Sequence, residues 1–127
     1  MRDIKLTLST DPAKRSPSTE EEARWLAKQG ELWYPLGPNR PVEAGPGCWV
    51  YFIRGGKLVS RAKAESFDPP SGKAKVSYTG SPTNRGSSWE VRVTAMELAR
   101  VRLDHPGFRG FRYVTPDEQA SFERAFE

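Results

Sequence analysis

The sequence predicts a mainly β domain of the α+β class: a small, closed or nearly closed β-barrel of about six or seven short strands with an early helix and a C-terminal helix. Eleven glycines and eleven prolines indicate many turns. Strand-like segments follow one another without helices between them, which disfavours a parallel βαβ sheet. With 127 residues the chain is long enough for a single core, so residues 1–127 are expected to form one domain.

Alternation of apolar and polar side chains predicts most of the strands. The segments DIKLTLS (3–9), AKVSYT (74–79) and WEVRVTA (89–95) each alternate in the way expected of a half-buried strand. Apolar positions continue from Met96 to Leu103, which predicts a further strand. The aromatic segment FRYV (111–114) predicts the last strand of the barrel.

Residues 45–65 predict a central β-hairpin, since an aromatic and β-branched run precedes Gly55-Gly56, and glycines supply the positive φ of a tight turn. The face with the largest side chains is expected in the core, and the opposite face ends in the basic residues Arg61 and Lys63. A two-residue turn would place Ile53 opposite Leu58, Tyr51 opposite Ser60, and Trp49 opposite Ala62.

Capping signals predict the bounds of two helices. Ser18 or Thr19 can cap the first helix, and Gly30 is placed to end it. The sequence TPDE (115–118) combines a capping threonine, a proline in the first turn and a glutamate at the capping-box position, so it begins the second helix. Residues 31–43 hold three prolines and a glycine, which predicts an irregular connection.

Charge is unevenly distributed along the chain, whose net charge is +4. Residues 31–114 carry 13 Lys and Arg against 7 Asp and Glu, whereas residues 115–127 carry 1 against 4. The β body is therefore basic, which indicates either a solvated surface or an acidic partner. No apolar run approaches the ~18 residues of a membrane span, and there is no signal-peptide core, so a cytoplasmic protein without a membrane partner is expected.

The residue types needed for common catalytic or metal chemistry are sparse. Cys48 and His105 are the only residues of their kind, and neither lies in a cluster with ligand spacing. Cys48 precedes the most apolar segment and is interpreted as a buried structural thiol; His105 is interpreted as a surface or turn histidine. Phosphate-cradling and dinucleotide-binding motifs are also absent, so no metal or cofactor is expected, and an enzymatic role is the less favoured one.

Basic residues interleaved with aromatic residues indicate nucleic-acid binding, because cations neutralise phosphates while flat rings stack on exposed bases. The alternative is that the rings of Trp33 and Tyr34 plug one end of the core. The clusters comprise Trp33, Tyr34 and Arg40; Arg61 and Lys63; Arg85 and Trp89; and Arg109, Phe111, Arg112 and Tyr113.

The order of these features resembles the PUA-like superfamily, and within it the EVE and ASCH groups. The likeness rests on LTLSTDP, the helix beginning at Thr19, LWYPLGPNR, the hairpin AGPGCWVYFIRGGKLVSRAKA, and the closing strand and helix FRYVTPDEQASF. Cys48 stands where the EVE pattern commonly has an aspartate, and the ASCH signature G-x-K-x-x-E-x-R is not intact. The likeness covers most of the chain and is one of order and pattern.

This resemblance implies a β-barrel that binds RNA, or a modified base in DNA, between the barrel and its helices. An aromatic cage would accept an unpaired or flipped base, Asn39 would read the edge of that base, and arginines would hold phosphates. By position, Trp33, Tyr34, Asn39 and Arg40 would line the cleft, and Arg112 and Tyr113 would flank it.

Two other functions are compatible with the sequence. A small hydrolase acting on a modified nucleoside would need a lysine or threonine beside a carboxylate, and Lys63 with Glu43 or Glu65 is the candidate combination. A protein-interaction domain would instead expose Trp25 and Trp33 as a patch.

Overall fold

A computed structural model of the chain describes residues 1–8, 18–70 and 88–127. In chain order the elements are β1 (Ile4–Leu8), α1 (Thr19–Gln29), β2 (Leu32–Gly37), β3 (Trp49–Arg54), β4 (Lys57–Asp68), β5 (Trp89–Val93), β6 (Glu97–Leu98), β7 (Phe111–Tyr113) and α3 (Pro116–Arg124). The strand expected at residues 74–79 lies outside the described residues.

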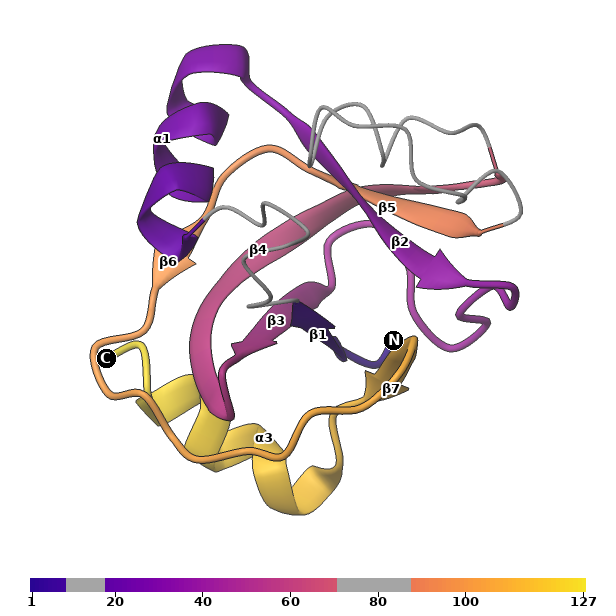
Figure 1. Ribbon diagram of the computed structural model, residues 1–127. Coiled ribbons are helices and arrows are strands. Elements are labelled where there is room, and N and C mark those ends of the chain that lie inside the picture. The colour runs from indigo at the N-terminus through magenta and orange to yellow at the C-terminus, as the bar shows by residue number, and fades with distance from the viewer. Residues whose placement is uncertain (9–17, 71–87) are drawn as a thin grey trace.

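The described strands form one seven-stranded sheet that curls into a half-barrel (Figure 1). The strand order is β2-β5-β4-β3-β1-β7, with β6 paired along β4. β1 runs parallel to β3 and antiparallel to β7, so the sheet is mixed. The prediction of a mainly β, barrel-like fold with an early and a C-terminal helix is confirmed.

The predicted hairpin is present, with Gly55 and Gly56 in the turn at φ 60° and 74°. Ile53 pairs with Leu58 as expected. A register shift then makes Val59 an extra residue in β4, which is the geometry of a β-bulge. The other two expected pairs are therefore wrong, since Tyr51 lies opposite Arg61 and Trp49 opposite Lys63.

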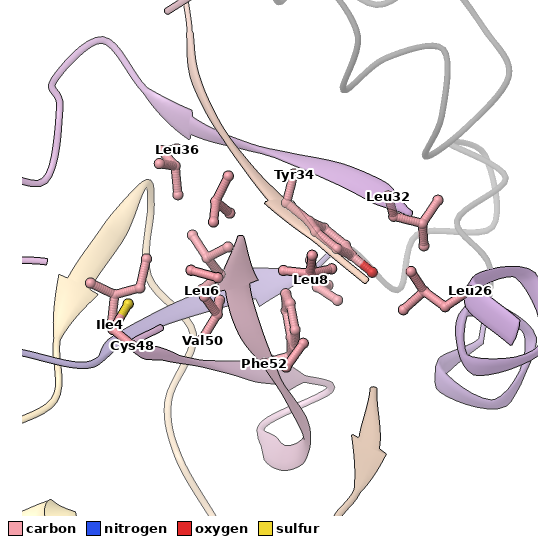
Figure 2. Close-up of a cluster of buried hydrophobic side chains, with 14 of the residues drawn as sticks. Ile4, Leu6, Leu8, Leu26, Leu32, Tyr34, Leu36, Cys48, Val50 and Phe52 are labelled. Carbon is pink, nitrogen blue, oxygen red and sulfur yellow. The ribbon is translucent and has the colours of Figure 1, made fainter. Parts of the chain in front are cut away.

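Both faces of β3 are buried, which differs from the predicted division into a core face and a basic face. Val50 and Phe52 point into the half-barrel, where Figure 2 shows them beside side chains from β1 and β2. Tyr51 and Ile53 point outward and pack beneath α3 instead. The second cluster comprises Tyr51, Ile53, Leu58, Val114, Phe122, Ala125 and Phe126.

The prediction of an irregular connection at residues 31–43 is wrong for its first half, which forms β2. Leu32, Tyr34 and Leu36 are buried in alternation, a period-two pattern that the prolines obscured. Pro35 is tolerated because β2 ends the order of the described strands and has β5 as its single partner among them, so one side of its backbone needs no ladder partner there.

The prediction of a strand from Met96 to Leu103 is also wrong, except for Glu97 and Leu98. Only Glu97 and Leu98 pair with β4, and Val101 is 57% exposed. The apolar side chains of this segment are spaced as in a strand, but their burial does not follow that spacing. Trp89–Val93 and Phe111–Tyr113 confirm the other two strands expected in this half of the chain.

The capping predictions are confirmed at both helices. Ser18 precedes α1 and its hydroxyl accepts a hydrogen bond from the backbone of Glu21, while Gly30 ends the helix at φ 90°. Thr115 and Glu118 form a reciprocal capping box at the start of α3. Neither described helix has the length and apolar character needed to cross a membrane.

Gly56→Ala is expected to destabilise the protein by about 1–2 kcal/mol, because an L side chain resists the left-handed backbone of the turn. An added Cβ would meet nothing within 4 Å, so backbone strain alone is tested. The control is Gly45→Ala, which has no left-handed φ and would contact the flexible Met1 side chain at 3.4 Å. Equal melting temperatures for the two variants would contradict this account of the turn.

Candidate nucleic-acid interface

The two ends of the strand order, β2 and β7, approach each other at a pair of glycines. A Cβ placed on Gly37 would lie 3.9 Å from the Cα of Gly110, and one on Gly110 would lie 3.4 Å from the Leu36 carbonyl oxygen. Both glycines have positive φ, 99° and 68°. We call the two segments that meet here, residues 37–43 and 109–113, the seam.

Hydrogen bonds join the two segments of the seam. The backbone N–H of Glu43 donates to the Tyr113 hydroxyl at 3.0 Å. Arg2 lies across both, since its backbone N–H donates to the Glu43 carbonyl at 2.8 Å and its guanidinium lies 4.6 Å from the centre of the Tyr113 ring. The segment after β2 and the last strand are therefore held side by side.

Three arginines of the seam are exposed: Arg40, Arg109 and Arg112. Arg40 lies 5.7 Å from the centre of the Trp89 ring, and Arg112 lies 4.9 Å from the centre of the Phe108 ring. Within residues 1–8, 18–70 and 88–127, none of these three pairs with a carboxylate. Carboxylate partners are present for Arg2, Arg54, Arg61, Arg92 and Arg102. Outside the seam, Arg24, Arg100 and Arg124 are exposed and likewise have no carboxylate partner within the described residues, so the seam is set apart by its three arginines lying in two segments that meet.

The basic residues of the hairpin, Arg61 and Lys63, lie away from the seam on β4. The Arg61 guanidinium sits 3.9 Å from the centre of the Trp49 ring and 4.5 Å from that of Phe126. It also pairs with Glu97 at 3.0 Å, so its charge is compensated. Lys63 is exposed and lies over the same Trp49 ring at 4.6 Å.

The aromatic cage expected from Trp33 and Tyr34 is not assembled. Tyr34 is fully buried against Phe52, with ring centres 4.7 Å apart, which corrects the expectation that its ring lines a cleft. Trp33 points to the opposite face of β2, where it is half-buried and its indole donates to Asp68 at 3.3 Å. The alternative interpretation, in which the rings of Trp33 and Tyr34 plug one end of the core, is confirmed for Tyr34.

A buried ion cluster that the sequence did not predict links β1 to α3. Lys5 is only 5% exposed, and its ammonium group lies 2.7 Å from both carboxylate oxygens of Glu118. His105 Nε2 lies 3.0 Å from the Lys5 ammonium and 3.1 Å from Glu118. His105 is therefore a half-buried member of the cluster, which corrects its interpretation as a surface histidine, although it does lie outside the helices and strands.

The Glu118 carboxylate is shared between this cluster and the cap of α3. Burial acts to raise its pKa, but hydrogen bonds from Lys5, from the Thr115 backbone and from His105 outweigh burial, so the pKa is held below its ordinary value. Period-two alternation places Lys5 on the outer face of β1, where α3 and the segment that holds His105 and Phe108 cover it. No local sequence signal marks that contact.

A second buried carboxylate lies in the first turn of α1. Glu22 is fully buried, pairs with Arg54 at 2.6 Å and accepts a hydrogen bond from the Tyr34 hydroxyl at 3.1 Å. Burial raises the pKa of Glu22 to about 7, against the opposing effects of Arg54 and Tyr34.

The lysine–carboxylate combination considered for a hydrolase is not formed. Glu43 pairs with Arg2, and Glu65 accepts a hydrogen bond from the Thr94 hydroxyl at 2.9 Å. In the part of the chain that the structure describes, Lys63 has no carboxylate partner. The tryptophans considered for a protein interface, Trp25 and Trp33, are both half-buried.

Cys48 is buried, with 2% of its surface exposed, as expected of a structural thiol. Burial raises the pKa of this thiol to about 11, which disfavours the nucleophilic thiolate. Among the described residues, no three His, Cys, Asp or Glu side chains are grouped to hold a metal ion.

The fold thus gathers five of the ten expected binding residues at the seam. Arg61 and Lys63 lie on the hairpin, Trp33 on the outer face of β2 and Tyr34 in the core, while Arg85 lies outside the described residues. The residues at the seam are Asn39, Arg40, Arg109, Arg112 and Tyr113. No protein-family model matches the sequence, and no curated protein matches it either.

Proposed function

We propose that this domain binds nucleic acid, RNA or DNA, through the seam. The observation that carries the proposal is the set of three exposed arginines, Arg40, Arg109 and Arg112, that lack a carboxylate partner within the described residues. Cations that are not compensated by the protein's own acids attract phosphates, and guanidinium groups bind them with two N–H donors. The basic balance of the β body supports the same partner.

The PUA-like resemblance belongs to this proposal. A half-barrel with an early and a C-terminal helix is compatible with that superfamily, and the ligand class that the resemblance implies is RNA or DNA with an unpaired or modified base. The expected cage is not part of the proposal, because Tyr34 is buried in the core.

The double variant Arg109→Ala/Arg112→Ala is expected to bind single-stranded RNA or DNA on the order of tenfold more weakly at low salt. Because each phosphate contact on a single strand contributes about 0.7 to the slope of log K against log salt, that slope should become about 1.4 shallower. Fluorescence anisotropy with labelled oligonucleotides, between about 50 and 200 mM salt, measures both quantities.

The matched control is Arg24→Ala/Arg124→Ala, which removes the same charge from α1 and α3. Both of these arginines are exposed, and α1 lies across the molecule from β7 (Figure 1). This control should keep the affinity and the slope of the parent protein. Absence of binding at low salt, or an equal loss in the control, would overturn the proposal.

A further inference from the structure

We infer that the seam holds the phosphate backbone of its ligand and leaves the bases unread. This inference rests on the proposed function and replaces the base-specific ligand that the resemblance implies with a phosphodiester chain of any sequence. It follows from the way in which the rings near the seam are already occupied. Phe108, Trp89 and Tyr113 each have one side on the protein core and a cation of the same chain over the ring, whereas Phe111 packs on the core and meets the Tyr113 ring edge-on.

Trp89 and Tyr113 are two of the rings beside the seam. Trp89 pairs in the sheet with Gly37, is half-buried against the interior core, and has the Arg40 guanidinium over its ring. Tyr113 packs on the same core and has Arg2 over its ring, while Phe111 meets it edge-on with ring centres 5.5 Å apart. A base that stacks on either ring must first displace an arginine.

Displacing that arginine offsets part of the gain from stacking. A base on an aromatic ring contributes roughly 1–3 kcal/mol, and an exposed cation over a ring contributes roughly 0.5–1 kcal/mol, which would be lost. The displaced guanidinium would also leave the position from which it can bind a phosphate of the nucleic-acid strand. The arrangement as it stands instead pre-orients the arginine, whose edge N–H groups remain available to phosphate oxygens.

The polar groups that would read a base are not held in place for it. Asn39 is exposed, and no side-chain hydrogen bond within the described residues orients it. The Trp33 indole donates to Asp68 on the outer face of β2, and the Tyr34 hydroxyl donates to Glu22 in the interior. Reading a base edge requires a positioned donor or acceptor, because an unpositioned one gives little discrimination.

The spacing of the arginines suits a short strand. Arg40 lies three residues from Gly37 and Arg109 one residue from Gly110, so their Cα atoms are within about 20 Å at 3.8 Å per residue. At the rise of about 3.4 Å per nucleotide along the axis of a helically stacked strand, about six nucleotides cover the largest such separation. A probe of about ten nucleotides therefore covers the seam.

The test compares oligothymidylate with an abasic phosphodiester strand of the same length, each labelled and titrated with the protein at low salt. The two dissociation constants should agree within about threefold, since stacking of even one base would separate them by roughly fivefold or more. A preference for oligothymidylate of more than about tenfold would overturn the inference and leave the proposed function standing. Binding to neither strand would overturn both.

Two single variants make the test specific to the covered rings. Arg40→Ala uncovers the Trp89 ring, so this variant should bind the abasic strand more weakly than oligothymidylate, by roughly fivefold. Arg109 covers no ring in the described residues, so Arg109→Ala should weaken both strands equally. An unchanged ratio in Arg40→Ala, with its melting temperature retained, would show that the arginine does not exclude the base.

Discussion

Replacing Glu118 by alanine is expected to destabilise the protein by about 3 kcal/mol, the lower end of the range for breaking a buried ion pair. The substitution leaves the ammonium group of Lys5, which is 5% exposed, without its carboxylate. It also opens the capping box at the start of α3, since Glu118 accepts the hydrogen bond from the Thr115 backbone. Urea unfolding followed by fluorescence of the four tryptophans measures the loss.

Three further variants separate these contributions of Glu118. Asp117→Ala removes an exposed carboxylate from the same helical turn and should cost a few tenths of a kcal/mol through the helix dipole alone. Glu118→Gln keeps a capping acceptor and removes the charge. Adding Lys5→Met to Glu118→Gln should recover much of the stability, because removing both partners of a buried pair is often nearly neutral. A Glu118→Ala cost no larger than that of Asp117→Ala would contradict this view of the cluster.

As the pH rises from about 5 to about 8, the free energy of unfolding is expected to fall, and Glu22 accounts for part of this loss. In the folded protein the pKa of Glu22 is raised to about 7 from its ordinary value of 4.5, with burial as the largest cause. Between these two values the folded state binds more protons than the unfolded state, so stability decreases as pH rises and levels off above the folded pKa. At about 1.4 kcal/mol per pKa unit, the full loss is about 3 kcal/mol.

Glu22→Gln should lack this part of the pH dependence, because an amide does not titrate. Glu21→Gln is the control, since Glu21 is the exposed neighbour of Glu22 in the same turn. Unfolding free energies of the two variants at four pH values across this range measure the difference, and all other titrating groups are common to both. Parallel pH profiles for Glu22→Gln and Glu21→Gln would rule out the assignment.

The parts of the fold that the sequence predicted are those encoded by neighbouring residues. Alternation within seven residues predicted β1 and β5, a short aromatic segment predicted β7, and the capping residues Ser18 and Thr115 predicted both helix starts. The missed strand β2 has the same alternation, but prolines in and after it favoured an irregular segment. The bulge at Val59 changes the register through the backbone, and no side-chain pattern announces it.

The candidate site was predictable in the same local sense. Arg109 and Arg112 stand beside aromatic residues in the sequence, and they remain exposed in the structure. The sequence did not reveal which rings would be covered, because a ring and its cation come from separate segments, as Arg40 and Trp89 do. The cluster of Lys5 with His105 and Glu118 joins residues about a hundred positions apart, a distance at which single-sequence patterns carry no information.

The position of β1 between β3 and β7 has a consequence for co-translational folding on the ribosome. Ile4 pairs with Val50 on one side and with Tyr113 on the other. Val50 is synthesised early, whereas Tyr113 is synthesised more than a hundred residues after Ile4. Until then one edge of β1 is unprotected, and closing so long a loop is slow. The nascent chain therefore carries an open sheet edge, the feature by which chaperones and aggregates engage unfinished proteins.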